Sequence, residues 1–176
     1  HPRVNILQPG PGVGGHCIAV DPWFIISKTP NESQLIHTAR KVNDYKPEWV
    51  IEKVKLVTTE FLSKNTDKTI SDVTVSCFGL AFKPNIDDLR ESPALKIVKE
   101  LASFNFKNFL AVEPNIHELP ASIENDIELV SIETAIDSSD ICVLLVDHAE
   151  FKLIDKSAFD NVITIDTKGI WRGGLR

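Results

Sequence analysis

The sequence predicts an α/β protein in which a Rossmann-like parallel sheet follows a long amphipathic helical segment. Three observations predict this fold. Residues 1–28 are rich in glycine and proline, residues 29–64 carry apolar side chains at helical spacing, and residues 68–170 alternate short apolar runs with helical segments. Such alternation, with continuously apolar strands, is typical of a parallel sheet covered on both faces. We therefore expect one region at 1–64 and an α/β domain at 65–176.

The first zone, residues 1–28, is predicted to be a loop. Glycines and prolines crowd residues 8–17, and an apolar run at residues 23–26 follows at once, which argues against a flexible linker. Glycines let a backbone approach a ligand closely and expose amide groups. The cysteine that ends this stretch, Cys17, is therefore a candidate functional residue.

The second zone, residues 29–64, is predicted to be helical. Thr29 is expected to cap a helix, with Pro30 in its first position and Glu32 completing a capping box. Pro47 is expected to break this helix and start a second one. After it, apolar residues recur at helical spacing: Val50, Val54, Val57 and Phe61, with Ile51 and Leu62 beside them. Another domain or another subunit must cover this apolar face.

The third zone is predicted to form the sheet. A helix should start at Ser92-Pro93, with Ala94, Ile97, Val98 and Leu101 on one face. A second helix is expected at residues 132–138. Five β-rich runs are expected to be strands: residues 69–81, 108–112, 127–130, 141–146 and 162–166.

Composition excludes several classes of protein. A formal net charge of -6 argues against a general nucleic-acid binder. The most apolar stretch, residues 141–146, is far shorter than the roughly 20 residues of a membrane helix. The chain contains no methionine, so we interpret it as a fragment or a processed chain. Three cysteines do not make a disulfide framework, which favours a reducing cytoplasm.

The three cysteines differ in their surroundings. Cys77 and Cys142 lie in predicted buried strands, where cysteine behaves as a small hydrophobic residue. Cys17 ends the glycine-rich loop, where a thiolate can be stabilised. If the backbone is helical from Cys17, Asp21 lies one turn away on the same face and can act as a base through a water molecule. The alternative is a buried cysteine in a tight turn, with Asp21 capping the next segment. His16 is a poor candidate for a partner of the Cys17 thiol, because adjacent residues rarely face each other.

A second candidate site is the loop between the first strand of the sheet and Ser92. Ligands of open α/β sheets bind beyond the carboxyl ends of the strands, where Lys83 and Arg90 lie. Two cations beside a helix N-terminus suit a diphosphate or uridine diphosphate. The alternative is that both pair on the surface with Asp87, Asp88 and Glu91. Only Gly79 follows the first strand, so the dinucleotide fingerprint is absent.

Two further features carry weaker predictions. Glu113, at the end of the second strand, occupies the place where a ribose-binding acid often sits, although a simple strand-end turn (Glu-Pro-Asn) explains it better. His37, His117 and His148 do not form a metal-ligand spacing with the cysteines. We therefore predict no metal site and interpret these histidines as surface or structural residues.

Three motifs occur together and in order along the chain. They are Gly14-Gly15-His16-Cys17 with Asp21, then Val42-Asn43-Asp44, then the run Gly79–Lys83 with Asp88-x-Arg90 and Ser92-Pro93. This ordered set resembles the UDP-glucose/GDP-mannose dehydrogenase family, and the resemblance spans essentially the whole chain. Residues 1–23 are most similar to the branch that oxidises UDP-N-acetylmannosamine or similar UDP-N-acetyl sugars. Which sugar is oxidised stays open.

The resemblance implies an NAD-dependent oxidation of the sugar C6 alcohol, first to an aldehyde and then, through a thioester on the cysteine, to the uronate. It implies that Cys17 is the nucleophile and that Asp21 assists proton transfer or orients water. The implied substrate-binding residues are Arg3 (from a partner subunit), Gly14, Gly15, Phe82 and Lys83. Arg90 is implied to reach the NAD phosphates.

The resemblance also implies what lies outside the chain. In the family, NAD is bound mainly by an amino-terminal domain, and the lysine and asparagine that stabilise the oxyanion belong to segments before His1. The chain alone is therefore expected to bind part of the UDP-sugar without turnover. The central helix implies a homodimer through Val50, Val54, Val57 and Phe61, in a cytoplasmic enzyme of polysaccharide biosynthesis.

Two other functions stay open. One is a non-catalytic α/β nucleotide-binding or regulatory module, in which the glycine-rich loop is structural. The other is a different thiol enzyme, which would need a base close to Cys17.

Many family members have serine or another small residue where this chain has His16, so the role of His16 is also open.

Overall fold

The computed structural model describes residues 7–171, and its centre is a sheet of five parallel strands in the order β3-β2-β1-β4-β5. The strands are short and mostly buried. They are β1 Thr74–Phe78, β2 Asn108–Val112, β3 Glu128–Leu129, β4 Ile141–Leu144 and β5 Ile163–Asp166. The predicted α/β class is confirmed, and all five predicted strand regions contain a strand.

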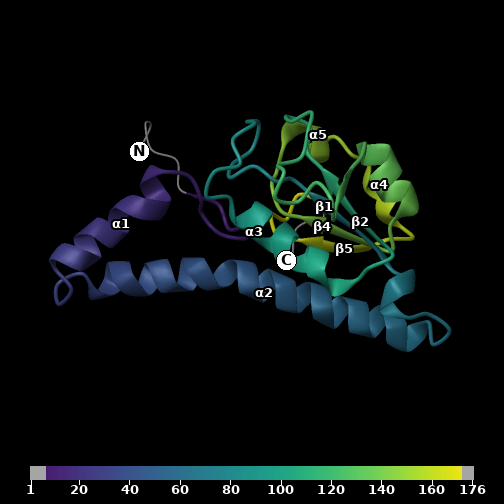
Figure 1. Cartoon of the computed structure of the whole chain (residues 1–176), viewed down its shortest axis with the longest axis horizontal. Coiled ribbons are helices and arrows are strands. Elements are labelled where there is room, and N and C mark those ends of the chain that lie inside the picture. The colour runs from purple at the N-terminus through teal and green to yellow at the C-terminus, as the bar shows by residue number, and fades with distance from the viewer. Residues whose placement is uncertain (1–6, 172–176) are drawn as a thin grey trace.

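Helices cover both faces of this sheet (Figure 1). On one face α2 and α3 pack against Val75, Cys77 and Val143; on the other, α4 and α5 pack around Phe78 and Leu144. The helices are α1 Cys17–Lys28, α2 Gln34–Lys64, α3 Pro93–Leu101, α4 Ile132–Ser138 and α5 Ala149–Lys152. Three short 3-10 turns, Ile70–Asp72, Ala102–Phe104 and Lys156–Phe159, connect them to the strands.

Local signals determine the start of α3. Ser92 caps the helix by accepting a hydrogen bond from the Leu95 N–H at 3.2 Å, and Pro93 is its first residue. The Ser92 hydroxyl also donates to the Leu80 carbonyl oxygen at 2.6 Å. This cap therefore begins the helix where the sequence predicted, and it also ties the start of α3 to the loop that leaves β1.

The predictions for the first two zones were partly wrong. The loop ends at Gly15, because α1 begins at Cys17 and continues through Pro22 to Lys28. Thr29 terminates α1 and does not cap the next helix; α2 begins at Gln34, after Ser33. The Thr29 N–H and hydroxyl both donate to the Ile25 carbonyl, at 2.9 and 3.0 Å, so its polar groups complete the preceding helix.

Pro47 does not break α2, which is another correction. Proline removes one backbone hydrogen bond, but Pro47 is buried and α2 continues over 31 residues. Figure 1 shows α1 along one half of α2 and α3 against the other, and both helices contact α2. Packing on both sides of Pro47 therefore compensates for the missing hydrogen bond.

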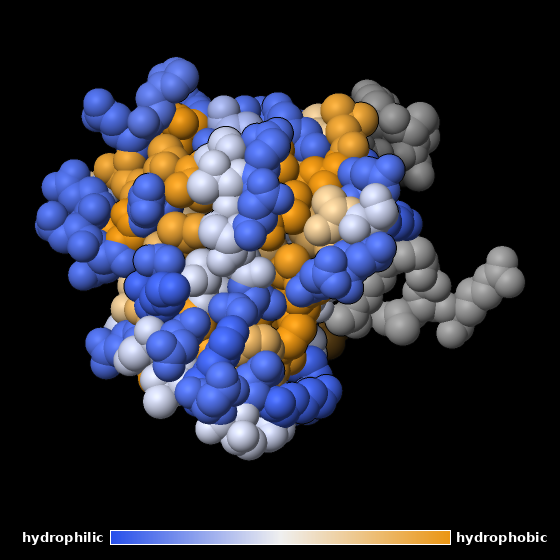
Figure 2. All heavy atoms as spheres, turned by 90° about the vertical axis from the view of Figure 1, so that its right-hand side faces the viewer, coloured by the Kyte–Doolittle hydropathy of each residue, from blue (hydrophilic) through white to orange (hydrophobic). Residues whose placement is uncertain are grey.

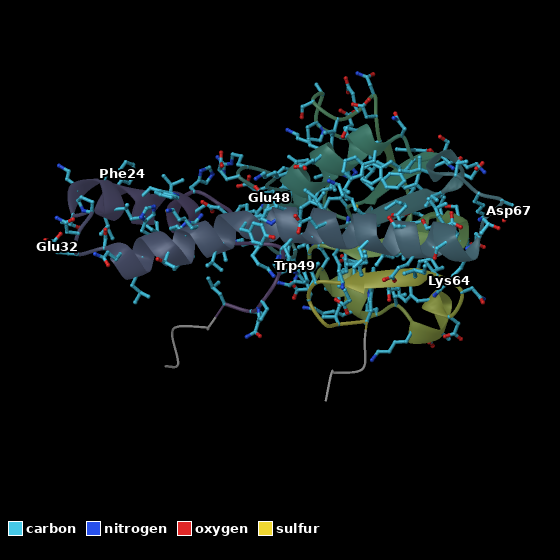
Figure 3. All side chains as sticks on the ribbon, turned by 90° about the horizontal axis from the view of Figure 1, so that it is seen from below. Phe24, Glu32, Glu48, Trp49, Lys64 and Asp67 are labelled. Atoms are coloured by element: carbon cyan, nitrogen blue, oxygen red, sulfur yellow. The ribbon has the colours of Figure 1, made fainter. Side chains whose placement is uncertain are left out.

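The apolar face of α2 is covered by the same chain. Val50 and Val54 are fully buried in the core that α2 shares with α3 and the sheet, and Val57 and Phe61 pack partly buried against that core. Val50 and Val54 are therefore unavailable for the predicted homodimer contact, because the interior of the chain uses them, while a contact through the partly exposed Val57 and Phe61 stays a prediction. Several large apolar side chains of α1 and α2 are exposed instead, among them Phe24 and Trp49, labelled in Figure 3.

Candidate functional site

The carboxyl ends of β1 and β4 define the centre of the candidate site. The chain leaves β1 toward β2 on one side and leaves β4 toward β5 on the other. Such a switch point opens a crevice beyond the strand ends, where α/β proteins bind ligands. Ala81, Phe82 and Lys83 reach it after β1, Val146 and Asp147 after β4.

The glycine-rich loop lies directly on the loop that follows β1. A Cβ atom on Gly14 would lie 2.2 Å from the Glu91 carbonyl oxygen and 2.7 Å from Pro93 Cδ. A Cβ atom on Gly15, whose φ is +84°, would lie 2.8 Å from the Phe82 ring. Only glycine allows this approach, so the structure brings together the two loops that the sequence singled out.

Asn43 fastens the glycine-rich loop to α2. Its Oδ1 accepts the Val13 N–H at 2.8 Å, and its Nδ2 donates to the Val13 carbonyl oxygen at 3.4 Å. Asn43 belongs to the Val42-Asn43-Asp44 motif, for which the sequence indicated no role. Asn43 therefore positions the glycine-rich loop. A contact between residues 30 positions apart leaves no periodic pattern in the sequence, so this role was not predicted.

The two loops enclose a pocket of about 290 Å³. Its wall includes Gly14 and Ile18 on one side and Phe82, Lys83 and Pro93 on the other, over a floor of Leu145 and Val146. A groove of about 450 Å³ lies between α2 and β5, but none of the predicted site residues lines it. We therefore assign the candidate site to the smaller pocket.

Two lysines reach the pocket from different strands. Lys83 is exposed, with its Nζ 5.5 Å from the centre of the Phe82 ring, and it forms no ion pair within the described part of the chain. Lys168, just beyond β5, is largely buried, and its Nζ lies 3.1 Å from Asp147 Oδ1. Lys168 was not predicted from the sequence, although it follows a strand end just as Lys83 does.

The Asp147 carboxylate bridges Lys168 at the pocket and the exposed Lys152 of α5. Its second oxygen lies 3.1 Å from Lys152 Nζ, so one carboxylate faces two cations. Partial burial acts to raise the pKa of Asp147, but hydrogen bonds and charge from Lys152 and Lys168 outweigh it and lower this pKa. With Lys83 included, this rim of the pocket carries an excess of positive charge.

Arg90 is paired within its own loop, as the alternative interpretation expected. Its guanidinium binds the Asp88 carboxylate with contacts of 2.7 to 3.1 Å, and the hydrogen bonds from Arg90 hold the pKa of Asp88 well below its usual range. His16 Nε2 lies 4.0 Å from the same carboxylate. His16 therefore faces Asp88, which leaves no support for a His16–Cys17 pair.

Cys17 is exposed and is the first residue of α1, and Asp21 is exposed one helical turn further on. The alternative of a buried cysteine in a tight turn, with Asp21 as a cap, is therefore wrong. Burial raises the pKa of both other thiols, that of Cys142 to about 12. Cys17 is thus the accessible thiol of the described chain. Arg3 lies outside the described residues.

The described residues do not form a dinucleotide site around Gly79. A Cβ atom on Gly79 would lie 2.4 Å from Val146 Cβ, so this glycine serves close packing of two strands. Glu113 is buried and hydrogen-bonded to backbone amides, so it is not placed to bind a ribose. Residues 7–171 also contain no cluster of three potential metal ligands and no helix long and apolar enough to cross a membrane.

Comparison with known proteins decides the family. Residues 76–173 match the UDP binding domain of the UDP-glucose/GDP-mannose dehydrogenase family, and residues 1–45 match its central domain. The chain belongs to this family. The family resemblance inferred from the three motifs is thereby confirmed.

Two curated relatives are dehydrogenases of N-acetylated nucleotide sugars. The chain is 55% identical over 172 residues to UDP-N-acetyl-D-mannosamine dehydrogenase of Salmonella typhimurium, covering 98% of the chain and 41% of that protein. It is 51% identical to an NDP-N-acetyl-D-galactosaminuronic acid dehydrogenase of Ralstonia solanacearum, covering 97% of the chain and 38% of that protein. The chain thus spans about two fifths of the length of these curated relatives.

Solved structures agree on the fold. UDP-D-ManNAc dehydrogenase of Pyrococcus horikoshii superimposes with a TM-score of 0.74 at 31% identity, over 99% of the chain and 39% of that structure. UDP-N-acetyl-mannosamine dehydrogenase of Staphylococcus aureus gives a TM-score of 0.68 at 35% identity, over 100% of the chain and 38% of that structure. Family members with this fold therefore include enzymes for the same class of sugar.

Proposed function

We propose that the chain is the nucleotide-binding and thiol-bearing part of an NAD-dependent nucleotide-sugar 6-dehydrogenase. Its proposed substrate is a UDP-N-acetyl-hexosamine, UDP-N-acetylmannosamine in particular, which is oxidised to the uronate. The observation that carries the proposal is the pocket formed jointly by the glycine-rich loop and the loop after β1. The similarity to the Salmonella enzyme supports the choice of sugar.

The pocket suits the uridine diphosphate end of the substrate. Lys83, with no ion pair in the described chain, and Lys168 offer ammonium groups to the diphosphate. The Phe82 ring and the apolar floor offer a surface for the uracil ring. Gly14 and Gly15 let the glycine-rich loop pack directly against Phe82, Glu91 and Pro93, and this close contact shapes the wall of the pocket that Gly14 lines.

Cys17 is the proposed nucleophile. Its thiolate adds to the carbonyl carbon of the C6 aldehyde, and the oxygen takes a proton to give a thiohemiacetal. Once this carbon has been oxidised to a thioester, water adds to it and the thiolate leaves, which releases the uronate. Asp21, one turn from Cys17, is placed to accept a proton from that water or to orient it.

NAD, when bound, would supply the hydride acceptor. Among the described residues no glycine-rich cradle follows β1, and Arg90 is exposed and paired with Asp88. We therefore propose that NAD is held mainly by a part of the protein outside this chain, with Arg90 reaching its phosphates. A cytoplasmic homodimer engaged in polysaccharide biosynthesis completes the proposal, with the exposed apolar residues of α1 and α2 available for contacts beyond this chain.

Turnover tests this function directly. The chain is joined to the amino-terminal part of the Salmonella relative that it does not match, and NADH is measured with UDP-N-acetylmannosamine as substrate. We expect two NADH per sugar, no uronate from Cys17→Ala, and normal turnover from Cys142→Ala, which removes a buried thiol. A Cys17→Ala variant that still forms uronate would contradict the proposed nucleophile. UDP binding without turnover in every variant would favour the non-catalytic module.

A further inference from the structure

Glu113 and His148 form a fully buried acid–base pair beneath the pocket. Both side chains have 0% exposed area, and His148 Nε2 lies 3.1 Å from Glu113 Oε2. Glu113 follows β2 and His148 follows β4, so the pair joins two strand ends on either side of β1. Neither residue lines the pocket, and the proposed chemistry uses neither of them.

Five donor contacts converge on the Glu113 carboxylate. Oε2 accepts the Leu80 N–H at 2.7 Å, the Ala81 N–H at 3.1 Å and the His148 Nε2–H. Oε1 accepts the backbone and side-chain N–H groups of Asn115, both at 3.2 Å. Burial acts to raise the pKa of Glu113, but the hydrogen bonds from His148 and Leu80 outweigh it and lower this pKa. The site therefore requires a carboxylate, because both oxygens accept from N–H groups.

The other nitrogen of His148 holds the far end of the same loop. Nδ1 accepts the Asn85 N–H at 2.9 Å, which assigns the neutral tautomer with its proton on Nε2. Asn85 adopts a left-handed backbone with φ at 61°, and its Oδ1 accepts the Ala149 N–H at 2.8 Å. Asn85 is thereby hydrogen-bonded both to the His148 ring and to Ala149, the first residue of α5.

These contacts surround the proposed ligand-binding residues. Glu113 holds Leu80 and Ala81 immediately before Phe82 and Lys83, and His148 holds Asn85 two residues after Lys83. We propose that Glu113 and His148 are positioning residues, which fix the loop so that Phe82 and Lys83 bind the nucleoside diphosphate. This inference rests on the proposed function, because it assigns the diphosphate to this loop.

A role in stability alone does not explain the arrangement. Burying a carboxylate together with a polar imidazole carries a large desolvation cost, and well-packed apolar residues of similar volume often serve a core equally well. Here the pair binds three backbone N–H groups of the loop that carries Lys83, those of Leu80, Ala81 and Asn85. Its remaining polar contacts are to Asn115, which also lies 3.0 Å from His148 Nδ1 through its Nδ2, and between the two side chains. Buried backbone N–H groups must find a hydrogen-bond acceptor. Because Glu113 and His148 provide acceptors at fixed positions, they determine where the backbone of this loop lies.

Two substitutions of His148 distinguish its hydrogen bond to Glu113 from its hydrogen bond to Asn85. In His148→Gln the side-chain amide can donate to Glu113, but the acceptor for Asn85 is lost; in His148→Asn the side-chain oxygen can replace Nδ1 and restore that acceptor. Leu101→Ala is the control, because Leu101 is fully buried at the opposite end of α3 from Ser92 and its side chain makes none of the hydrogen bonds that hold the loop. All variants are titrated calorimetrically with UDP, and exchange of the Asn85 amide hydrogen is measured.

We expect His148→Gln to weaken UDP binding by about ten-fold or more and to accelerate exchange at Asn85. His148→Asn should recover most of both properties, and Leu101→Ala should bind UDP as the unmodified chain does. Normal UDP binding by His148→Gln, an equal loss in Leu101→Ala, or no recovery in His148→Asn would each overturn the positioning role while the proposed function stands. Absence of UDP binding by the unmodified chain would overturn both.

Discussion

Alanine in place of Gly14 should separate the two loops that form the pocket. The new Cβ atom would lie 2.2 Å from the Glu91 carbonyl oxygen, 2.7 Å from Pro93 Cδ and 3.1 Å from Phe82 Cβ. Gly14 lies outside the left-handed backbone region, so the cost is steric and not conformational. A normal carbon–oxygen contact needs roughly 1 Å more than this, and overpacking of this kind costs about 1–3 kcal/mol.

Urea unfolding and UDP titration measure the two consequences of Gly14→Ala. For a chain of this size each kcal/mol lowers the melting temperature by about 2–4 °C. UDP affinity should fall as well, because Gly14 and Phe82 both line the pocket. The control is Ala135→Val, which overpacks the opposite face of the sheet around a fully buried alanine and should cost similar stability without changing UDP affinity. Unchanged stability and affinity in Gly14→Ala would refute the described contact between the loops.

Three further predictions concern titration and capping. Iodoacetamide at pH 8 should label the exposed Cys17 first, because a pKa of about 12 leaves only about one Cys142 thiol in 10⁴ as thiolate. Intact mass and peptide mapping measure the order of labelling, and labelling of Cys142 before Cys17 would contradict this prediction. Because the folded pKa of Glu113 is lowered, its contribution to stability is complete above its ordinary value, near pH 4.5, and is lost as pH falls through the folded value. Urea midpoints from pH 7 to 3 should therefore fall less steeply in Glu113→Gln than in the unmodified chain, and parallel curves would contradict this. Ser92→Ala should cost about 1–2 kcal/mol in urea unfolding, and a loss below about 0.5 kcal/mol would show that the cap is dispensable.

The sheet was predictable because its signals are local. The apolar runs that became β2 and β4, the cap at Ser92, and the helix at residues 132–138 each depend on neighbouring residues. The candidate loops were predictable for a related reason. Parallel strands bring their carboxyl ends to one edge, so Lys83 could be placed near the site before the structure was known.

The errors arose where distant contacts override local signals. Pro47 predicts a break, but packing of α1 and α3 keeps α2 continuous. An apolar stripe on a helix does not say what covers it, and for Val50 and Val54 the cover is the chain's own core. Glu113 and His148 lie 35 residues apart in sequence, so nothing local indicated that they meet. The same limit explains the missed role of Asn43.

Titration of the chain with UDP tests the central claim most directly. The comparison is between the unmodified chain, Lys83→Ala, and Lys99→Ala, which removes an equally exposed lysine of α3 away from the pocket. We predict measurable binding by the unmodified chain and by Lys99→Ala, and a loss of at least about ten-fold, or 1.4 kcal/mol, in Lys83→Ala. Equal affinity in all three, or no binding by the unmodified chain, would contradict a uridine diphosphate site at the end of β1.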